Sequence, residues 1–217
     1  MRDSLGQTSR MNVEAYILVG GKSRRFGSDK ALAKIDGTTL AERATDTVLR
    51  AIPNGPIFFI AGGSEDLASE GRRLSTPLIC DQIIDRGPVG GLHAALVNAK
   101  SEWIFLFACD LPLMTSGFIS RLLDECSDGL EVVLPEQPDG RLQPLCAFYR
   151  VGAALPAVEK VIDTNPNAAM MAVIDKLKAR IVRPEESADL PPDIWTNVNR
   201  QEDLAKIARK LSHRESI

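Results

Sequence analysis

Two short segments carry most of the side chains that could do chemistry. In the first, an apolar run leads into Gly20 and Gly21, and a basic stretch with Arg25 and Lys30 follows. Glycines let backbone N–H groups approach a ligand closely, and successive N–H groups can form a concave anion site. This combination predicts a loop that binds a polyphosphate. The competing interpretation of the basic side chains is that they are ordinary solvated surface residues.

The second segment places Asp110 directly after the apolar run Trp103–Ala108, before a Leu-Pro turn. A carboxylate at the end of a buried strand is costly unless it is paired. Mg²⁺ prefers one or two carboxylates together with substrate phosphate oxygens. With a phosphate loop expected nearby, we predict that Asp110 holds Mg²⁺. The alternative is a helix N-cap or turn aspartate.

A second glycine-rich loop follows Asp81 and contains Gly87, Gly90 and Gly91. Glycines leave the backbone N–H and C=O groups beside the next helix uncovered, and a flat base can be read by such groups. A closely packed helix-entry loop would explain Gly90 and Gly91 equally well.

These segments need elements that bring them together. Short apolar runs alternate with helical patterns, which predicts an α/β fold: a three-layer α/β/α sandwich with a mostly parallel, Rossmann-like sheet. Such sheets bind ligands beyond the carboxyl ends of their strands, so the first glycine loop and Asp110 are expected in one crevice. Strands are predicted at 15–19, 57–61, 77–80, 103–108, 131–134, 145–149 and 180–183, and helices at 39–52, 89–98, 115–126, 151–162, 167–178 and 200–211.

Length and composition limit the class of protein. The 217 residues suit a single domain, 13–217, after a flexible tail at 1–12. A net charge of −3 argues against a nucleic-acid binder. The four cysteines form no C-x-x-C pair, and at least three lie in apolar surroundings, which favours a reducing, cytoplasmic compartment. No apolar run approaches the roughly 20 residues of a membrane helix, and residues 1–12 lack the apolar centre of a signal peptide.

The first loop also matches a longer pattern. Residues 18–30 resemble the signature L-[AV]-G-G-x-S-x-R-[MF]-G-x-D-K of the nucleotidyltransferase family that includes molybdenum cofactor guanylyltransferase. A Walker A loop is excluded because Tyr16 stands where its first glycine would be, and no G-x-G-x-x-G follows the strand. Three further segments resemble family motifs in the same order: the loop 81–92, the stretch around Asp110, and Asn197–Leu204.

The resemblance implies roles for individual residues. It implies catalytic roles for Lys30, Arg25 and Asp110, with Asp110 as the Mg²⁺ ligand, and a contact between Asp81 and the guanosine portion of the nucleotide. The implied nucleotide-binding residues are Leu18, Val19, Gly20, Gly21, Lys30, Asp81, Gly87, Pro88 and Gly91, and the implied acceptor-side residues are Gln143, Pro144, Asn197 and Asn199. The resemblance further implies a nucleotide-binding part over about 13–130 and an acceptor-binding part over about 131–200.

Asn199 has a second possible role, and residues 61–63 depart from the family pattern. Asn199 is also a plausible N-cap for the last helix, with Glu202 completing a capping box. Where the family can carry an asparagine at the nucleotide, this chain has Ala61-Gly62-Gly63. Backbone amides of these glycines would then have to replace the asparagine contact.

The implied reaction is transfer of GMP from GTP to the terminal phosphate of molybdenum-molybdopterin, with release of pyrophosphate. Implied partners are GTP, the molybdenum cofactor and, transiently, other cofactor-pathway proteins or apo-molybdoenzymes. Two alternatives stay open. One is a related transferase that uses CTP or a sugar-phosphate acceptor, and the other is a non-catalytic nucleotide or cofactor carrier. Retention of both Lys30 and Asp110 speaks against the carrier.

Overall fold

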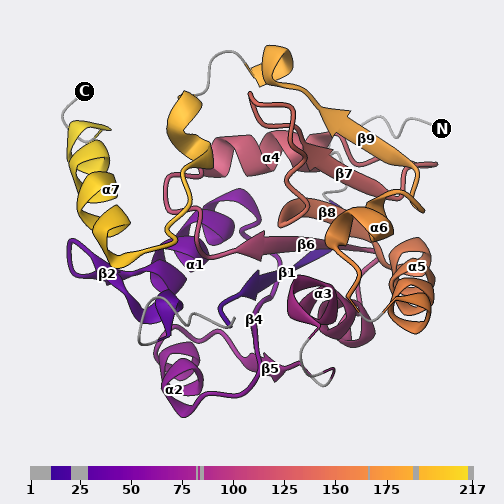
Figure 1. The fold of residues 1–217 in the computed structure, drawn as a ribbon, viewed down its shortest axis with the longest axis horizontal. Coiled ribbons are helices and arrows are strands. Elements are labelled where there is room, and N and C mark those ends of the chain that lie inside the picture. Colours follow the sequence, from indigo (N-terminus) through magenta and orange to yellow (C-terminus); the bar gives the residue numbers. More distant parts are fainter. Residues whose placement is uncertain are drawn as a thin grey trace, which may run out of the picture.

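A computed structural model describes residues 11–20, 29–81, 83, 86–165, 167–187 and 191–214. Its main sheet has seven strands in the order β5–β4–β1–β6–β8–β7–β9 (Figure 1). The strands are β1 Val13–Leu18, β4 Ile57–Ala61, β5 Leu78–Cys80, β6 Trp103–Ala108, β7 Val132–Pro135, β8 Cys146–Arg150 and β9 Ala179–Val182. Within this sheet, β8 runs antiparallel to its neighbours β6 and β7, and the other neighbouring strands are parallel to each other. The predicted mostly parallel sheet is confirmed.

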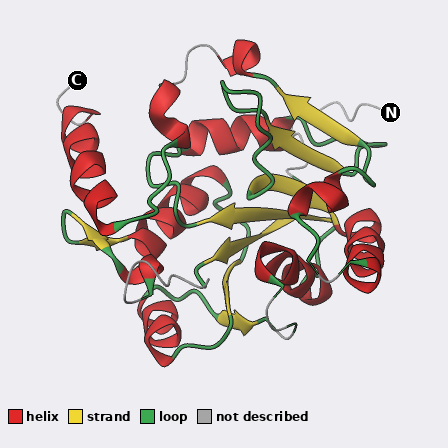
Figure 2. Cartoon of the chain, in the orientation of Figure 1, coloured by secondary structure: helices red, strands yellow, loops and turns green. Residues whose placement is uncertain are grey.

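Helices cover both faces of this sheet, as the alternating pattern predicted (Figure 2). Buried side chains of α1 and α4 form one core with one face, and those of α3, α5 and α6 form a second core with the other. β6 is buried along its whole length, which explains its continuous apolar run. The helices are α1 Leu40–Ala51, α2 Glu65–Arg73, α3 Gly87–Asn98, α4 Ser116–Asp124, α5 Val151–Thr164, α6 Met170–Ile174 and α7 Gln201–Arg214. Short 3₁₀ turns lie at η1 Lys30–Leu32, η2 Pro184–Ser187 and η3 Pro192–Trp195.

A small hairpin and the last helix form a third cluster outside the two main cores. β2 (Lys34–Ile35) and β3 (Thr38–Thr39) are joined by Asp36 and Gly37, both at positive φ. Asp-Gly is a residue pair typical of tight hairpin turns, so the sequence did contain this signal. Ile35 of the hairpin and Ile207 of α7 are fully buried in the same cluster. The C-terminal helix is therefore fixed beside the segment that follows Lys30.

One expectation about a helix was wrong, and one helix was missed. The predicted helix over 167–178 is only α6, because the carbonyl of Lys178 already accepts the N–H of Glu131 and the chain there pairs with the sheet. α2 was not predicted at all. Its one buried large apolar side chain is Leu67, too few to give a helical apolar stripe. The signal that could have found α2 is Ser64 as N-cap, with acidic residues in the first turn and arginines in the last.

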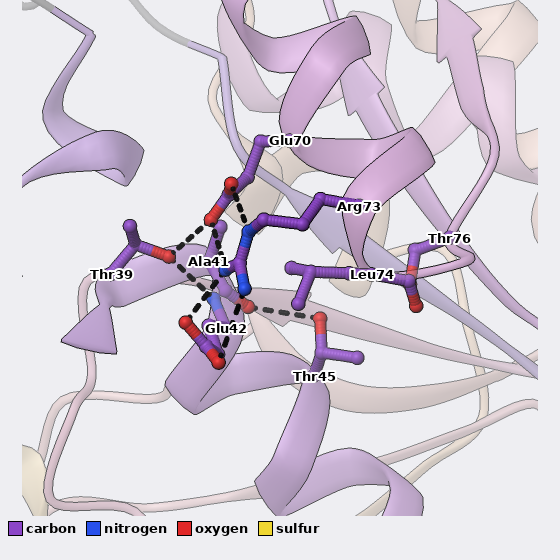
Figure 3. A network of polar contacts seen from close by, with 8 residues as sticks. All are labelled: Thr39, Ala41, Glu42, Thr45, Glu70, Arg73, Leu74 and Thr76. Carbon is purple, nitrogen blue, oxygen red and sulfur yellow. Dashed lines mark hydrogen bonds and ion pairs between the residues drawn. The ribbon is translucent and has the colours of Figure 1, made fainter.

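A polar network ties α2 to the start of α1 (Figure 3). Thr39 is the N-cap of α1: its hydroxyl accepts the N–H of Glu42 at 3.0 Å and donates to Glu70 at 2.6 Å. Arg73 of α2 donates to Glu70 at 2.8 Å and to Glu42 at 2.7 Å. Glu70 and Arg73 of α2 thus hold both Thr39 and Glu42 of α1.

We expect Glu70→Gln to destabilise the protein modestly and in a pH-dependent way. The Arg73 guanidinium, and secondarily the Thr39 hydroxyl, hold the pKa of Glu70 below its ordinary value of 4.5, against the opposing effect of burial. A carboxyl with a lowered folded-state pKa stabilises the fold above its unfolded-state pKa and loses this contribution as the pH falls through the folded value. The loss at pH 7 should be about 1 kcal/mol or less, because Arg73 is half exposed and solvent screens the pair.

The measurement is the urea midpoint of wild type and Glu70→Gln between pH 7 and pH 3. The difference between the two proteins should be largest above pH 4.5 and shrink below it. A difference that stays constant down to pH 3 would show that the charge of Glu70 does not contribute.

Candidate active site

The strand register places Gly20, where the first glycine loop begins, beside Asp110. In the parallel pair β1–β6, Leu18 lies opposite Ala108, so Gly20 and Asp110 each follow two positions later at the same edge of the sheet. β4 lies on one side of β1 and β6 on the other, so this edge is the point where the strand order reverses. Open α/β sheets bind ligands at such a point. The prediction that the two segments meet at one sheet edge is therefore confirmed for Gly20 and Asp110, whereas residues 21–28 lie outside the described residues.

Lys30 connects the two segments directly. Its Nζ lies 2.7 Å from Oδ2 of Asp110, although the two residues are 80 positions apart. The same Nζ also donates to the carbonyl of Val198 at 3.1 Å. The side chains of Lys30 and Asp110 remain 21% and 25% exposed, so a ligand in water can reach this pair.

The segment before α7 forms one wall of the site. The N–H of Val198 donates to the backbone carbonyl of Asp110 at 2.9 Å, which brings Asn197 and Asn199 close to Asp110. The expected capping box of Asn199 and Glu202 was wrong: α7 begins at Gln201, so Arg200 directly precedes the helix, and the acidic partner is a different residue. Asp203, not Glu202, accepts the N–H groups of Asn199 and Arg200, at 2.9 and 2.8 Å. Asp203 lies in the first turn of α7 with its carboxylate directed back to these two N–H groups, and they lower its pKa.

Asp81 lies at the carboxyl end of β5, two strands from β1 in the sheet. Partial burial raises the pKa of its carboxyl, although the N–H of Ile83 at 2.9 Å and the nearby His93 act in the opposite direction. A Cβ on Gly90 would lie 2.7 Å from Oδ2 of Asp81. The glycine is therefore what allows this carboxylate to lie against the start of α3.

Other predicted nucleotide-binding residues have packing roles in the fold. A Cβ on Gly91 would lie 2.6 Å from Cδ2 of Leu18, so Gly91 lets α3 approach β1. A Cβ on Gly20 would lie 2.7 Å from both Cα and Cβ of Ala61. The N–H groups of Val19 and Gly20 both donate to the carbonyl of Ile60 and are thereby used within the sheet.

Gly87 differs from the other glycines of this region. It has φ +53° and no heavy atom within 4 Å of its ideal Cβ position, so its conformation and not close packing requires glycine. Pro88 follows it in the first turn of α3, where a missing N–H costs nothing.

The predicted acceptor-side residues lie at the same edge of the sheet. β8 runs antiparallel to β6, so its first residues lie beside the last residues of β6, and the N–H of Ala108 donates to the carbonyl of Leu145. Gln143 and Pro144 come just before β8. The N–H of Gln143 donates to Pro135, and the carbonyl of Pro144 accepts the Tyr149 hydroxyl at 2.7 Å.

Some of the predicted features fall outside the described residues, one contact was missed, and the predicted buried thiols can be checked. Gly21 and Arg25 lie outside the described residues, as does most of the expected tail at 1–12. Sequence reasoning missed the carbonyl of Val198 as a partner of Lys30, and no local signal points to it. The predicted buried thiols are confirmed: Cys109, Cys126 and Cys146 are buried, and burial raises the pKa of Cys109 to about 12.

Two kinds of site were not found in the described part of the chain. Within residues 11–20, 29–81, 83, 86–165, 167–187 and 191–214, no group of three or more His, Cys, Asp or Glu side chains could enclose a metal ion by itself. No helix within the same ranges is long and apolar enough to cross a bilayer.

The site combines the Lys30 ammonium, the Asp110 carboxylate and Gly20 at the switch point of the sheet. Nucleotide-binding α/β proteins bind their ligands at such a point, beside glycines. A polyphosphate would meet the positive charge of Lys30, and a metal ion would meet Asp110. The fold as a whole is similar to solved structures, one of them a nucleotidyl transferase. The fold and the site fit the class of the nucleotidyltransferases, and a matching family model of that class shows the assignment.

The chain belongs to the MobA-like NTP transferase domain family, whose model matches residues 15–181. It is 32% identical over 197 residues to the molybdenum cofactor guanylyltransferase of Desulfosudis oleivorans, covering 89% of this chain and 93% of that protein. In fold it is similar to molybdopterin-guanine dinucleotide biosynthesis protein A from Archaeoglobus fulgidus, with TM-score 0.75, 22% identity and coverage of 93% and 99%. It is also similar to a nucleotidyl transferase from Methanothermobacter thermautotrophicus, with TM-score 0.72, 14% identity and coverage of 94% and 99%.

Proposed function

We propose that this protein transfers GMP from GTP to the terminal phosphate of molybdenum-molybdopterin, giving the guanine dinucleotide form of the cofactor and pyrophosphate. The observation that carries the proposal is the pair formed by Lys30 and Asp110, 2.7 Å apart at the switch point of the sheet. The similarity to a relative named molybdenum cofactor guanylyltransferase supports the choice of nucleotide and acceptor.

In this reaction an oxygen of the acceptor phosphate attacks the α-phosphorus of GTP, and the bond to the pyrophosphate oxygen breaks. The protein has to align the two reactants and neutralise the charge that develops on the leaving pyrophosphate. Lys30 would contact the triphosphate, together with Arg25 and the backbone of Gly21, while Gly20, whose N–H already donates to Ile60, would let the nucleotide approach the strand end. Asp110, whose carboxylate lies 2.7 Å from the Lys30 ammonium, would hold a metal ion against the same phosphates.

The residues present fit Mg²⁺ as the metal. Asp110 offers one carboxylate, and Mg²⁺ commonly binds through one or two carboxylates, substrate phosphates and water. Asn197 and Asn199, brought close by the contact between Val198 and Asp110, are candidates for contacts with the metal or the acceptor. When bound, the ion would neutralise phosphate charge.

The guanine end of GTP would lie near Asp81 at the carboxyl end of β5. A carboxylate can accept hydrogen bonds from N1–H and N2–H₂ of guanine together, which adenine does not offer. We assign Leu18, Val19, Gly87, Pro88 and Gly91 to the walls of this nucleotide site. Gln143 and Pro144 would face the acceptor, so that about 13–130 binds the nucleotide and about 131–200 the acceptor.

Two other functions stay as alternatives. One is the same reaction with CTP or with a sugar-phosphate acceptor, and the other is a non-catalytic cofactor carrier. Transient contact with cofactor-pathway proteins or apo-molybdoenzymes follows from the proposed product. A cytoplasmic location of the protein, which the cysteine pattern favours, stays a prediction.

The test is calorimetric titration with GTP, CTP and ATP, each with Mg²⁺, followed by an assay of pyrophosphate release with the loaded molybdopterin acceptor. We expect GTP to bind most tightly and Asp81→Asn to lose this preference, because an amide replaces one of the two acceptor oxygens with a donor. Preference for CTP would keep the reaction type and change the base. Binding without pyrophosphate release would favour the carrier.

A further inference from the structure

We propose that Asp29 and Ser64 are positioning residues: α2 holds Lys30 in the site through a hydrogen bond from Ser64 to Asp29. This inference rests on the proposed function, because it assigns Lys30 to the triphosphate. Ser64 Oγ lies 2.6 Å from Asp29 Oδ2, and Asp29 directly precedes Lys30. The two residues come from segments 35 positions apart, so the contact is a tertiary one.

Among the residues that the structure describes, which exclude 21–28, no local contact accounts for the carboxylate of Asp29. Asp29 occupies the N-cap position of η1, yet its side chain makes no capping hydrogen bond there. The two backbone hydrogen bonds of this turn, from Leu32 to Asp29 and from Ala33 to Lys30, shape the turn but do not orient it against the sheet. The bond from Ser64 supplies a connection between this turn and another element.

Ser64 is itself on a fixed support. Its Oγ is the N-cap of α2 and accepts the N–H of Leu67 at 3.4 Å, while its own proton goes to Asp29. Leu67 is buried in the core beneath α2. Further along the helix, Glu70 and Arg73 hold Thr39 and Glu42 of α1 (Figure 3). α2 therefore holds the polypeptide on both sides of η1, β2 and β3.

This arrangement sets where the Lys30 side chain begins. Lys30 Nζ has to reach both Asp110 Oδ2 and the carbonyl of Val198, at 2.7 and 3.1 Å. Loss of the bond to Ser64 would free the residue immediately before Lys30 while leaving the partners of its ammonium intact. A displacement of about 1 Å at a reacting centre can lower a rate by roughly 100-fold.

The deciding variant is Ser64→Asp. Aspartate is as good an N-cap as serine, so α2 keeps its start, but the new carboxylate cannot donate to Asp29 and repels it. We expect kcat for pyrophosphate release to fall by about 10- to 100-fold, with a higher KM for GTP, as for loss of a hydrogen bond to a charged group. The urea midpoint should stay close to that of the wild type, and Ser64→Thr, which keeps the hydroxyl, should retain the rate.

The double variant Asp29→Asn, Ser64→Asp tests the pair itself. In the double variant the amide introduced at position 29 can donate to the carboxylate introduced at position 64. The hydrogen bond is then restored with donor and acceptor exchanged, so most of the lost kcat should return. Asp29→Asn alone keeps an amide oxygen that accepts from Ser64 and should be only mildly slower. A wild-type kcat in Ser64→Asp would overturn the inference. It would also be overturned if the double variant folded normally but had the same low kcat as Ser64→Asp.

Failure of this inference can be told from failure of the proposed function. If the wild type releases pyrophosphate from GTP and the variants do so equally well, only the positioning role of Asp29 and Ser64 is wrong. If the wild type releases none, calorimetry with inorganic tripolyphosphate still tests the inference. Ser64→Asp should then bind it about tenfold or more weakly than Ser64→Thr, and equal binding would overturn the inference.

Discussion

Replacing Asp110 with alanine is expected to lower nucleotidyl transfer by roughly 10³-fold or more without unfolding the protein. The expected loss is large because Asp110 is the only carboxylate we assign to Mg²⁺, and a metal that neutralises phosphate charge contributes most in the transition state. The fold should survive because the backbone carbonyl of Asp110, not its side chain, accepts the N–H of Val198. The carboxylate is also partly exposed, so its removal leaves no buried cavity.

The measurement is Mg²⁺-dependent pyrophosphate release, with the thermal midpoint as a check on folding. Asp110→Asn is the matched control for the metal. It keeps the shape and an oxygen that accepts from Lys30, but it lacks the charge that Mg²⁺ requires. Direct titration with Mn²⁺ in the presence of GTP gives a second readout. A near-normal rate in Mg²⁺ for Asp110→Ala would show that the metal assignment is wrong.

Lys30→Ala is expected to lower kcat/KM for GTP by roughly 10²- to 10³-fold. The ammonium would contact the triphosphate where negative charge develops, and charge-assisted hydrogen bonds at a reacting centre are stronger than neutral ones. The variant also leaves Asp110 without the ammonium that lies 2.7 Å away. The substitution should therefore change both binding of the triphosphate and the environment of the proposed metal ligand.

The measurement is steady-state kinetics with calorimetry for GTP affinity. Lys30→Arg keeps the charge but spreads it over a planar, larger group, so it should recover part of the binding and little of kcat. The double variant with Asp110→Ala should lose less than the sum of the two single losses in free energy, because the two residues are in contact. Unchanged rate and affinity in Lys30→Ala would remove Lys30 from the site.

Some features of the fold and the site could be predicted from the sequence alone. β4 and β6 have the bounds predicted from their apolar runs, because burial of a strand leaves a local pattern. Asp110 and the glycine loop were expected at one crevice, because parallel strands end at a common edge. Thr115, at the start of the helix predicted over 115–126, is the N-cap of α4 and accepts the N–H of Phe118.

Other features had no local pattern. α2 carries mostly charged residues, so its helical form depends on the cap at Ser64 and on Leu67 in the core, not on an apolar stripe. Asp203 and not Glu202 accepts the N–H groups before α7, because the helix begins at Gln201 and Asp203 is its third residue, one position later than the sequence pattern indicated. The short extent of α6 follows from pairing of Lys178 with the sheet.

The sequence by itself determined the family signature, the layered α/β fold and most of the side chains that we assign to the chemistry. Only the tertiary structure decided that Lys30 meets Asp110 and the carbonyl of Val198, and that α2 is tied to Asp29 through Ser64. The reason is physical. Apolar periodicity and caps are set by neighbours in the chain, whereas a contact between residues 80 or 168 positions apart depends on how whole elements pack.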